Sequence, residues 1–202
     1  MPTIYQLKPA FQNLLRPIVG RLAGAGVTAN QVTIAAFVLS AATGAALWRW
    51  PTARAALLAV PAVCFARMAL NAIDGMLARE FGQKSKLGAI LNELGDVLSD
   101  AALYLPFAAV GAVSAPLVVA VVLLAVVSEM AGVVGVQIGA SRRYDGPAGK
   151  SDRAFVFGLI ALLAGCGVAP GTWTNVLLAI EVALLAWTIV NRARGALRER
   201  PA

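Results

Sequence analysis

The chain contains no histidine and only two cysteines among its 202 residues. The absence of histidine excludes histidine acid–base catalysis and histidine metal ligation. Cys64 and Cys166 both lie in apolar stretches, where an unpaired cysteine behaves as a small hydrophobic residue. We therefore expect neither a disulfide framework nor a thiolate metal site.

Charge is also scarce, because charged residues make up 13% of the chain and apolar residues 59%. A soluble domain has about 25% charged and about 45–50% apolar residues. The composition predicts an all-α integral membrane protein with one membrane domain. We expect no cleaved signal peptide. The net charge of +7 is expected to serve topology and contact with anionic membrane lipids, with no nucleic-acid partner.

Apolar segments long enough to cross a bilayer recur six times. Their approximate limits are 31–50, 56–79, 87–110, 115–139, 154–170 and 173–191. Lysine and arginine gather in the N-terminal segment, in the loops after the second and fourth spans, and in the tail 192–202. The positive-inside rule then predicts that both termini are cytoplasmic, as in a multi-pass protein of a bacterial inner membrane.

The N-terminal residues 1–30 are expected to lie at the membrane surface. Between residues 3 and 18, apolar side chains recur among polar ones at helical spacing, which is typical of an amphipathic interfacial helix. Pro9 is expected to bend or interrupt it. The predicted domains are thus an interfacial segment at 1–30, a six-helix membrane domain at 31–191 and a basic cytoplasmic tail at 192–202.

Polar side chains cluster where the second and third spans meet the charged loop 80–86. Asp74 precedes the loop centre by about ten residues and Asn92 follows it by about nine, while Asn71 and Asp96 are each about thirteen residues away, so an antiparallel hairpin would pair them in two layers. Helical spacing places each set on one face, with Asp100 a turn deeper than Asp96. The pattern predicts an oxygen-lined cavity that opens to the cytoplasm; interhelical hydrogen bonds without a ligand are the alternative.

Oxygen ligands of this kind suit a hard divalent cation such as Mg²⁺ or Mn²⁺. The small residues beside them, Gly75, Ala78, Gly88 and Gly95, would allow close helix approach or entry of a bulky ligand. Elsewhere in the apolar segments, Arg67 and Glu129 are expected to pair with each other, and Glu181 to pair elsewhere or to lie in a dimer interface.

The stretch Asp74-Gly75-x2-Ala78-Arg79-x8-Gly88-x3-Asn92-x3-Asp96, with Asn71 three residues ahead, resembles the signature of the CDP-alcohol phosphatidyltransferases. Residues 26–33 are similar to that family's lead into its first span. The resemblance implies a phospholipid-synthesis enzyme that transfers a phosphatidyl-type group from a CDP-activated lipid, such as CDP-diacylglycerol, to an alcohol and releases CMP. It also implies a fold of six spans, and related enzymes are often homodimers.

The resemblance further implies a role for each position of the motif. Metal ligation falls to Asp74, Asn71, Asn92 and Asp96, and Asp96 is also the expected general base. The CDP site falls to Gly75, Ala78, Arg79 and Gly88, with Arg79 as a phosphate contact. The signature has aspartate where this chain has Asn71 and Asn92, and each change removes one negative charge, so one metal ion or two are both left open. Glu93 and Asp100 are candidates to compensate.

Four basic residues in the loop after the fourth span, Arg142, Arg143, Lys150 and Arg153, have two interpretations. They either follow the positive-inside rule or form a clamp for a phosphate of the acceptor or of the CDP-lipid. Related enzymes that use phosphorylated polyols carry basic residues in similar places, which extends the expected acceptors from simple alcohols to polyol phosphates. Two other functions remain open from the sequence: a relative that binds CDP-lipid without turnover, and a small cation transporter, which the restriction of polar residues to the cytoplasmic halves of two spans disfavours.

Overall fold

A computed structural model describes residues 4–199, and the side chains of residues 9–199. The described residues are helical, with no strand among them. The elements are α1 (Ile4–Gly24), α2 (Ala29–Arg49), α3 (Arg54–Glu80), α4 (Lys86–Tyr104), the 3₁₀ helix η1 (Leu105–Ala109), α5 (Ala115–Val134), the 3₁₀ helix η2 (Gly135–Ile138), α6 (Lys150–Gly165) and α7 (Thr172–Arg198). The apolar positions expected at residues 4–8 lie outside the described side chains, and residues 1–3 and 200–202 lie outside the described chain.

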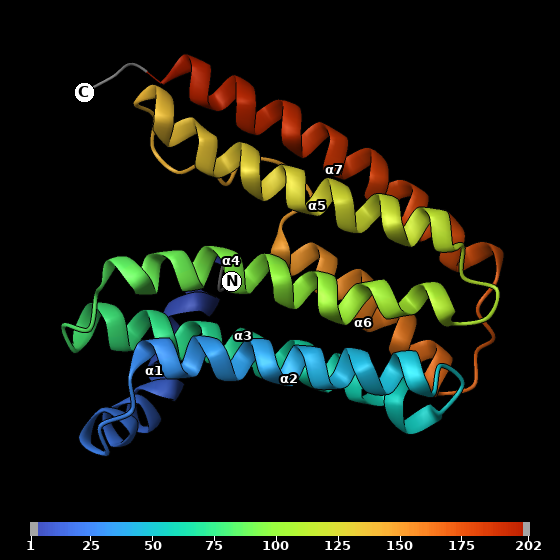
Figure 1. Ribbon diagram of the computed structural model, residues 1–202, viewed down its shortest axis with the longest axis horizontal. Helices are drawn as coiled ribbons and strands as arrows, with labels where there is room; N and C mark the ends of the chain where they lie inside the picture. Colours follow the sequence, from blue (N-terminus) through green and yellow to red (C-terminus); the bar gives the residue numbers. More distant parts are fainter. Residues whose placement is uncertain (1–3, 200–202) are drawn as a thin grey trace.

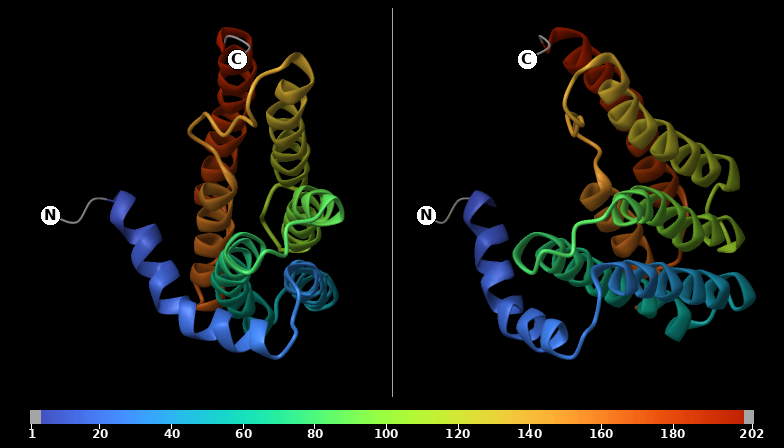
Figure 2. Two further views of the ribbon diagram at one scale, coloured as in Figure 1. Left: turned by 90° about the vertical axis from the view of Figure 1, so that its left-hand side faces the viewer. Right: turned by 60° about the vertical axis from the view of Figure 1, so that its left-hand side comes forward.

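Helices α2–α7 form a bundle in two parts, in which successive helices run antiparallel, whereas the packed pairs α2 with α4 and α5 with α7 run parallel (Figure 1). Helices α2, α3, α4 and α6 pack side by side, and α5 and α7 form a pair that diverges from them toward the end where α7 finishes. Helix α1 runs across that end of the bundle instead of along it (Figure 2). We call this the polar end, because it carries the loops 25–28 and 81–85. The orientation of α1 suits a helix that lies in a membrane interface.

Four of the described helices are long and apolar enough to cross a membrane: Ala29–Arg49, Arg54–Glu80, Ala115–Ile138 and Thr172–Arg198. The other two predicted spans correspond to α4, which carries several charges, and α6, which has 16 residues. Large apolar side chains on the outside of the bundle, such as Leu123, Ile180 and Trp187, are between 50% and 63% exposed, as expected for surfaces that face lipid.

The limits of several helices differ from those of the predicted spans and segments, for local reasons. The third span was expected to continue to residue 110, but α4 ends at Tyr104 because Pro106 cannot donate to an α-helical turn. Residues 192–198, predicted as tail, continue α7. Helix α1 continues past Pro9 to Gly24. Lys150 and Arg153 lie in the first turn of α6 and not in a loop, because Asp152 accepts a hydrogen bond from the Gly149 amide at 2.8 Å and caps the helix.

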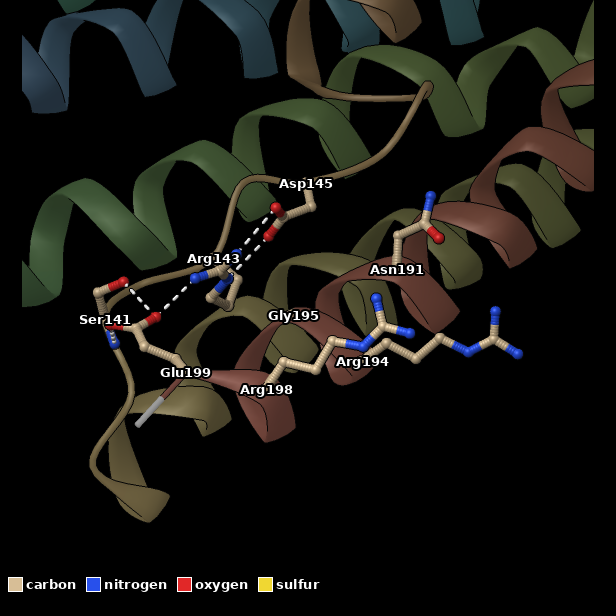
Figure 3. A pocket seen from close by; sticks show the side chains of 8 residues that line it. All are labelled: Ser141, Arg143, Asp145, Asn191, Arg194, Gly195, Arg198 and Glu199. Atoms are coloured by element: carbon tan, nitrogen blue, oxygen red, sulfur yellow. Dashed lines mark hydrogen bonds and ion pairs between the residues drawn. The ribbon is translucent and has the colours of Figure 1, made fainter. Parts of the chain in front are cut away.

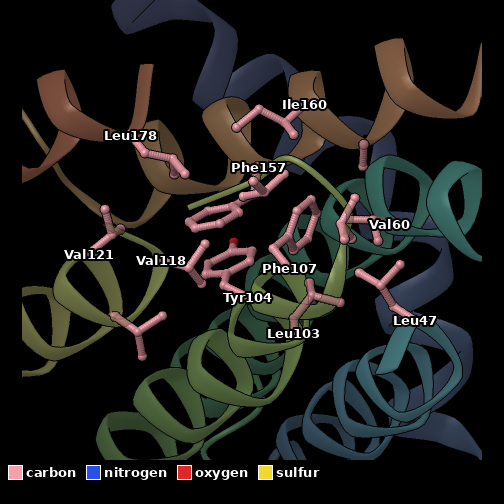
Figure 4. Close-up of a cluster of buried hydrophobic side chains, with 14 of the residues drawn as sticks. Leu47, Val60, Leu103, Tyr104, Phe107, Val118, Val121, Phe157, Ile160 and Leu178 are labelled. Carbon is pink, nitrogen blue, oxygen red and sulfur yellow. The ribbon is translucent and has the colours of Figure 1, made fainter. Parts of the chain in front are cut away.

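The main core lies in the middle of the bundle (Figure 4). Tyr104 stacks on Phe157 with ring centroids 4.3 Å apart, and Phe107 meets Phe157 edge-on at 5.0 Å. These rings join α4 and η1 to α6 and are fully buried. A second cluster, which includes Val19, Ile73 and Leu77, holds α1 against α3. The two clusters fix the helices that carry the polar residues.

Helices α2 and α4 approach each other at Gly44. A Cβ atom added there would lie 1.9 Å from the carbonyl oxygen of Ala102. We expect Gly44→Ala to push α4 away and to destabilise the bundle by about 1–3 kcal/mol, measured as a lower melting temperature in detergent. Gly20→Ala is the control, since its added Cβ would meet nothing within 4 Å. An unchanged melting temperature for Gly44→Ala would show that the helices do not pack this closely.

Candidate active site

The loop between α3 and α4 is fixed to the start of α2. Gln83 accepts a hydrogen bond from the Ala29 amide at 2.7 Å and donates to the Val27 carbonyl at 3.3 Å. Thr28 caps α2 in a reciprocal capping box with Gln31. Helix α2 therefore forms a third wall beside the hairpin. The hairpin predicted from the sequence has two walls, and the third comes from residues 26–33, whose similarity to the family's lead into its first span is the signal for it.

A cavity of about 740 Å³ opens between these three helices at the polar end. It is lined by Ala29, Asn30, Thr33, Asp74, Gly75, Ala78, Arg79, Gln83, Lys84, Ser85, Lys86, Gly88, Ala89 and Asn92. The structure thus brings together Asp74, Asn92 and all four residues that were predicted to bind CDP. It adds Asn30 and Thr33 from α2, together with Lys84 of the loop and Lys86 at the start of α4.

Asp74 is the buried acid of this cavity. It is 5% exposed, and its Oδ2 accepts a hydrogen bond from the Thr33 hydroxyl at 2.8 Å. Among the described residues no basic side chain forms an ion pair with it. Its charge is therefore available to a cation that enters the cavity.

Asn71 and Asp96 meet in a second layer, as counting along the hairpin predicted. The Asn71 Nδ2 atom donates to Asp96 Oδ1 at 3.2 Å. The Lys150 ammonium donates to Asp96 Oδ2 at 2.5 Å, so α6 also contributes to the site. Both oxygens of the predicted general base thus have a partner, and Lys150 contacts a carboxylate instead of a free anion site.

The candidate metal ligands supply two carboxylates and two amides. In the described part of the chain no group of three or more Asp, Glu or Cys side chains is arranged to hold a metal ion. Glu93 and Asp100, the two candidates to compensate, both pair with arginines: Arg142 lies 2.8 Å from Glu93, and Arg153 lies 2.9 Å from Asp100. Oxygens of Asp74, Asp96, Asn71 and Asn92 remain, and this all-oxygen donor set fits a hard divalent cation.

A buried ionic network lies behind this site. Its ion pairs, all between 2.8 and 3.1 Å, are Arg67–Asp100, Arg153–Asp100, Arg153–Glu129, Arg142–Glu129, Arg142–Glu93 and Arg192–Glu129. The predicted pair of Arg67 with Glu129 was wrong, since Arg67 binds Asp100. Among the described residues, Arg153 is the arginine that pairs with both Asp100 and Glu129. Glu181 is 2% exposed, and its Oε1 has no hydrogen-bond partner among the described residues.

Arg143 lies in a separate cavity of about 750 Å³ between the segment 139–149 and the end of α7 (Figure 3). Its guanidinium contacts Asp145 at 2.8 Å and Glu199 at 2.6 Å. The hydrogen bond from Arg143 holds the pKa of Asp145 below its usual range. The four basic residues predicted as a phosphate clamp therefore do not converge on one site, and each has an acidic partner.

The chain belongs to the CDP-alcohol phosphatidyltransferase family, whose sequence model matches residues 26–187. It is therefore a membrane transferase of phospholipid biosynthesis.

Two kinds of relative support this assignment. The chain is 48% identical over 195 residues to the inner membrane protein YnbA of Escherichia coli (strain K12), covering 96% of each protein. Its fold resembles that of the phosphatidylinositol phosphate synthase PgsA1 of Mycobacterium tuberculosis. The structure of that protein with CDP-DAG bound gives a TM-score of 0.73 at 23% identity and covers 92% of this chain and 97% of that one. Its complex with manganese and citrate gives 0.72 at 23% identity and covers 92% of each.

Proposed function

We propose that the protein transfers a phosphatidyl-type group from a CDP-activated lipid, such as CDP-diacylglycerol, to an alcohol and releases CMP. The observation that carries this proposal is the cavity of about 740 Å³ between α2, α3 and α4, which gathers Asp74, Asn92, Gly75, Ala78, Arg79 and Gly88. The CDP-DAG bound to the similarly folded PgsA1 supports the choice of donor.

The CDP group would lie in this cavity. Arg79, Lys84 and Lys86 line it and can donate to pyrophosphate oxygens. Gly88 leaves space in the cavity, because a Cβ atom added there would lie only 2.8 Å from Asn30 Oδ1, which also lines it. Gly75 and Ala78 likewise present little side-chain bulk.

We assign the divalent cation, Mg²⁺ or Mn²⁺, to the oxygens of Asp74, Asn71, Asn92 and Asp96. When bound, such an ion would neutralise phosphate charge and stabilise the departing CMP. Thr33 holds the Asp74 carboxylate in place for this role. The manganese complex of PgsA1 supports a divalent metal.

Asp96 would accept the proton of the acceptor hydroxyl. The hydroxyl oxygen forms a bond to the lipid-side phosphorus, the bond from that phosphorus to the bridging oxygen breaks, and CMP leaves with the bond's electrons. Asn71 orients Asp96 through the 3.2 Å hydrogen bond. Lys150 must move from Asp96 Oδ2 before that oxygen can take the proton.

We also propose six membrane-spanning helices, α2–α7, at residues 31–191, with an interfacial segment at 1–30 and a basic tail at 192–202. Both termini and the cavity would face the cytoplasm of a bacterium, and the protein would lie in the inner membrane. The antiparallel run of successive helices and the position of α1 across the polar end support this topology, as does the inner-membrane relative. We also propose a homodimer, because related enzymes are often homodimers.

The test is release of CMP by purified protein in detergent micelles that contain CDP-diacylglycerol. Mg²⁺ or Mn²⁺ is added with a panel of alcohols, and an Asp96→Asn variant is measured beside the native protein. We expect metal-dependent CMP release that the variant lacks. No CMP from any alcohol, together with retained calorimetric binding of CDP-diacylglycerol, would instead identify a lipid-binding protein without turnover.

A further inference from the structure

Three arginines converge on one carboxylate behind the proposed active site. Glu129 accepts hydrogen bonds from Arg142 at 2.9 Å, Arg153 at 3.1 Å and Arg192 at 3.1 Å. These arginines come from the segment 139–149, from α6 and from α7, whereas Glu129 lies on α5. We call this group the arginine cage. It is the densest collection of cationic donors among the described residues, and the chain's own Glu129 occupies its centre.

The cage is buried. The side chains of Arg153 and Arg192 are 2% exposed, and that of Glu129 is 14% exposed. An incoming phosphate would have to displace the Glu129 carboxylate and leave it without partners in a region of low polarity. Removing the partner of a buried ion costs several kcal/mol. A phosphate would therefore gain little from arginines that are already paired.

Every arginine of the network has an acidic partner, and the buried nitrogens without a hydrogen-bond partner among the described residues are Arg67 Nε, Arg153 Nη1 and Arg192 Nε. Arg142 also binds Glu93, and Arg153 also binds Asp100, which itself holds Arg67. The four arginines of the network thus face three carboxylates, each arginine with an acidic partner within 3.1 Å. The chain's own carboxylates thus neutralise three of the four positive charges.

The other two members of the predicted clamp, Arg143 and Lys150, lie outside the cage. Arg143 pairs with Asp145 and Glu199 in the separate cavity of about 750 Å³. Lys150 becomes available when Asp96 takes up its catalytic role, but a single ammonium is a point donor without the planar fork that recognises phosphate. It can equally donate to a hydroxyl oxygen of an uncharged alcohol. The lysines of the CDP cavity face the donor's own pyrophosphate.

We infer that the acceptor is an uncharged alcohol or polyol and not a phosphorylated one, because Glu129 fills the anion position of the arginine cage. This inference rests on the proposed transferase function and narrows its substrate class. It also revises the expectation that Arg142, Arg143, Lys150 and Arg153 clamp an acceptor phosphate. Their main task is to neutralise the acidic residues of the chain itself.

The first test compares matched acceptors with native protein, CDP-diacylglycerol and Mn²⁺. Glycerol is paired with glycerol 3-phosphate, and myo-inositol with inositol 1-phosphate. We expect kcat/KM for CMP release to be at least about tenfold higher for the uncharged member of a productive pair, which corresponds to about 1.4 kcal/mol. A phosphorylated acceptor that is used as well as its uncharged partner, or better, would overturn the inference.

The second test does not depend on turnover. Binding of inorganic phosphate is measured by calorimetry for native protein, Glu129→Gln and the control Glu181→Gln. We expect Glu129→Gln to bind one phosphate more than the native protein and Glu181→Gln do, with millimolar or tighter affinity, since that change frees the cage, whereas Glu181 forms no ion pair with a described arginine.

The two failures can be told apart. If no alcohol releases CMP, the transferase proposal fails, while the phosphate titration still decides the state of the cage. Phosphate binding by the native protein that is lost in Arg192→Gln would overturn the inference. Should Glu129→Gln not fold, the native titration and the acceptor pairs remain decisive.

Discussion

Asp74→Asn is expected to reduce metal-dependent CMP release roughly a thousandfold, since loss of several kcal/mol of metal-assisted stabilisation corresponds to about a factor of ten per 1.36 kcal/mol. The variant keeps the size of the side chain and can keep its contact with the Thr33 hydroxyl, 2.8 Å away in the native protein. Only the charge is lost. Because Asp74 has no basic partner among the described residues, the effect should come from the bound cation and not from a broken ion pair.

A second measurement, besides CMP release, is the binding of Mn²⁺, which is monitored by electron paramagnetic resonance. We expect weaker binding in Asp74→Asn at an unchanged melting temperature. Glu80→Gln is the matched control: Glu80 belongs to the same helix, but it forms an exposed pair with Arg16 at 3.1 Å, and such pairs contribute about 0–1 kcal/mol. Full activity of Asp74→Asn would show that Asp74 is not a metal ligand.

Asp100→Asn is expected to produce the largest loss of stability. Asp100 is the only acidic partner of Arg67 among the described residues, and both are about 5% exposed. The substitution leaves a buried guanidinium without a counter-ion, which costs about 3–5 kcal/mol. The measurement is the thermal midpoint in detergent, together with yield from the membrane.

The double variant Arg67→Met with Asp100→Asn distinguishes this cause from a loss of packing. Removing both charges should restore part of the lost stability, because neighbouring residues in one network are not additive. Arg153 keeps Glu129 as a partner in either background. A double variant as unstable as the sum of the two single ones would mean that the buried charge is not the cause.

Much of the site could be predicted from the sequence because the rise of a helix is fixed. Counting from the loop 80–86 placed Asn71 opposite Asp96, and their side chains are hydrogen-bonded. The same counting placed Asp74 and Asn92 together, and they line one cavity. Which residues face each other on two helices joined by a short loop depends only on their distance from that loop. It can therefore be predicted without knowledge of the rest of the fold.

The ion pairs could not be predicted in this way. Arg67 selects Asp100 over Glu129 through the rotation of α3 against its neighbours, which spacing does not determine. Lys150 reaches Asp96 across 54 residues because α6 begins at Lys150. That start depends on the path of the segment 139–149, where Ala148 is fully buried and donates to the Thr188 hydroxyl. These contacts depend on long-range packing.

The place of Asp74 along α3 has a consequence for kinetics. Six residues separate it from the end of the helix at Glu80, which is about 9 Å and is similar to the depth of a lipid headgroup layer. In the proposed orientation, both the lipid donor and the lipid product keep their acyl chains in the bilayer throughout the reaction. The rate should therefore follow the mole fraction of CDP-lipid in the surface, so that added inert lipid dilutes the substrate even when its bulk concentration is constant.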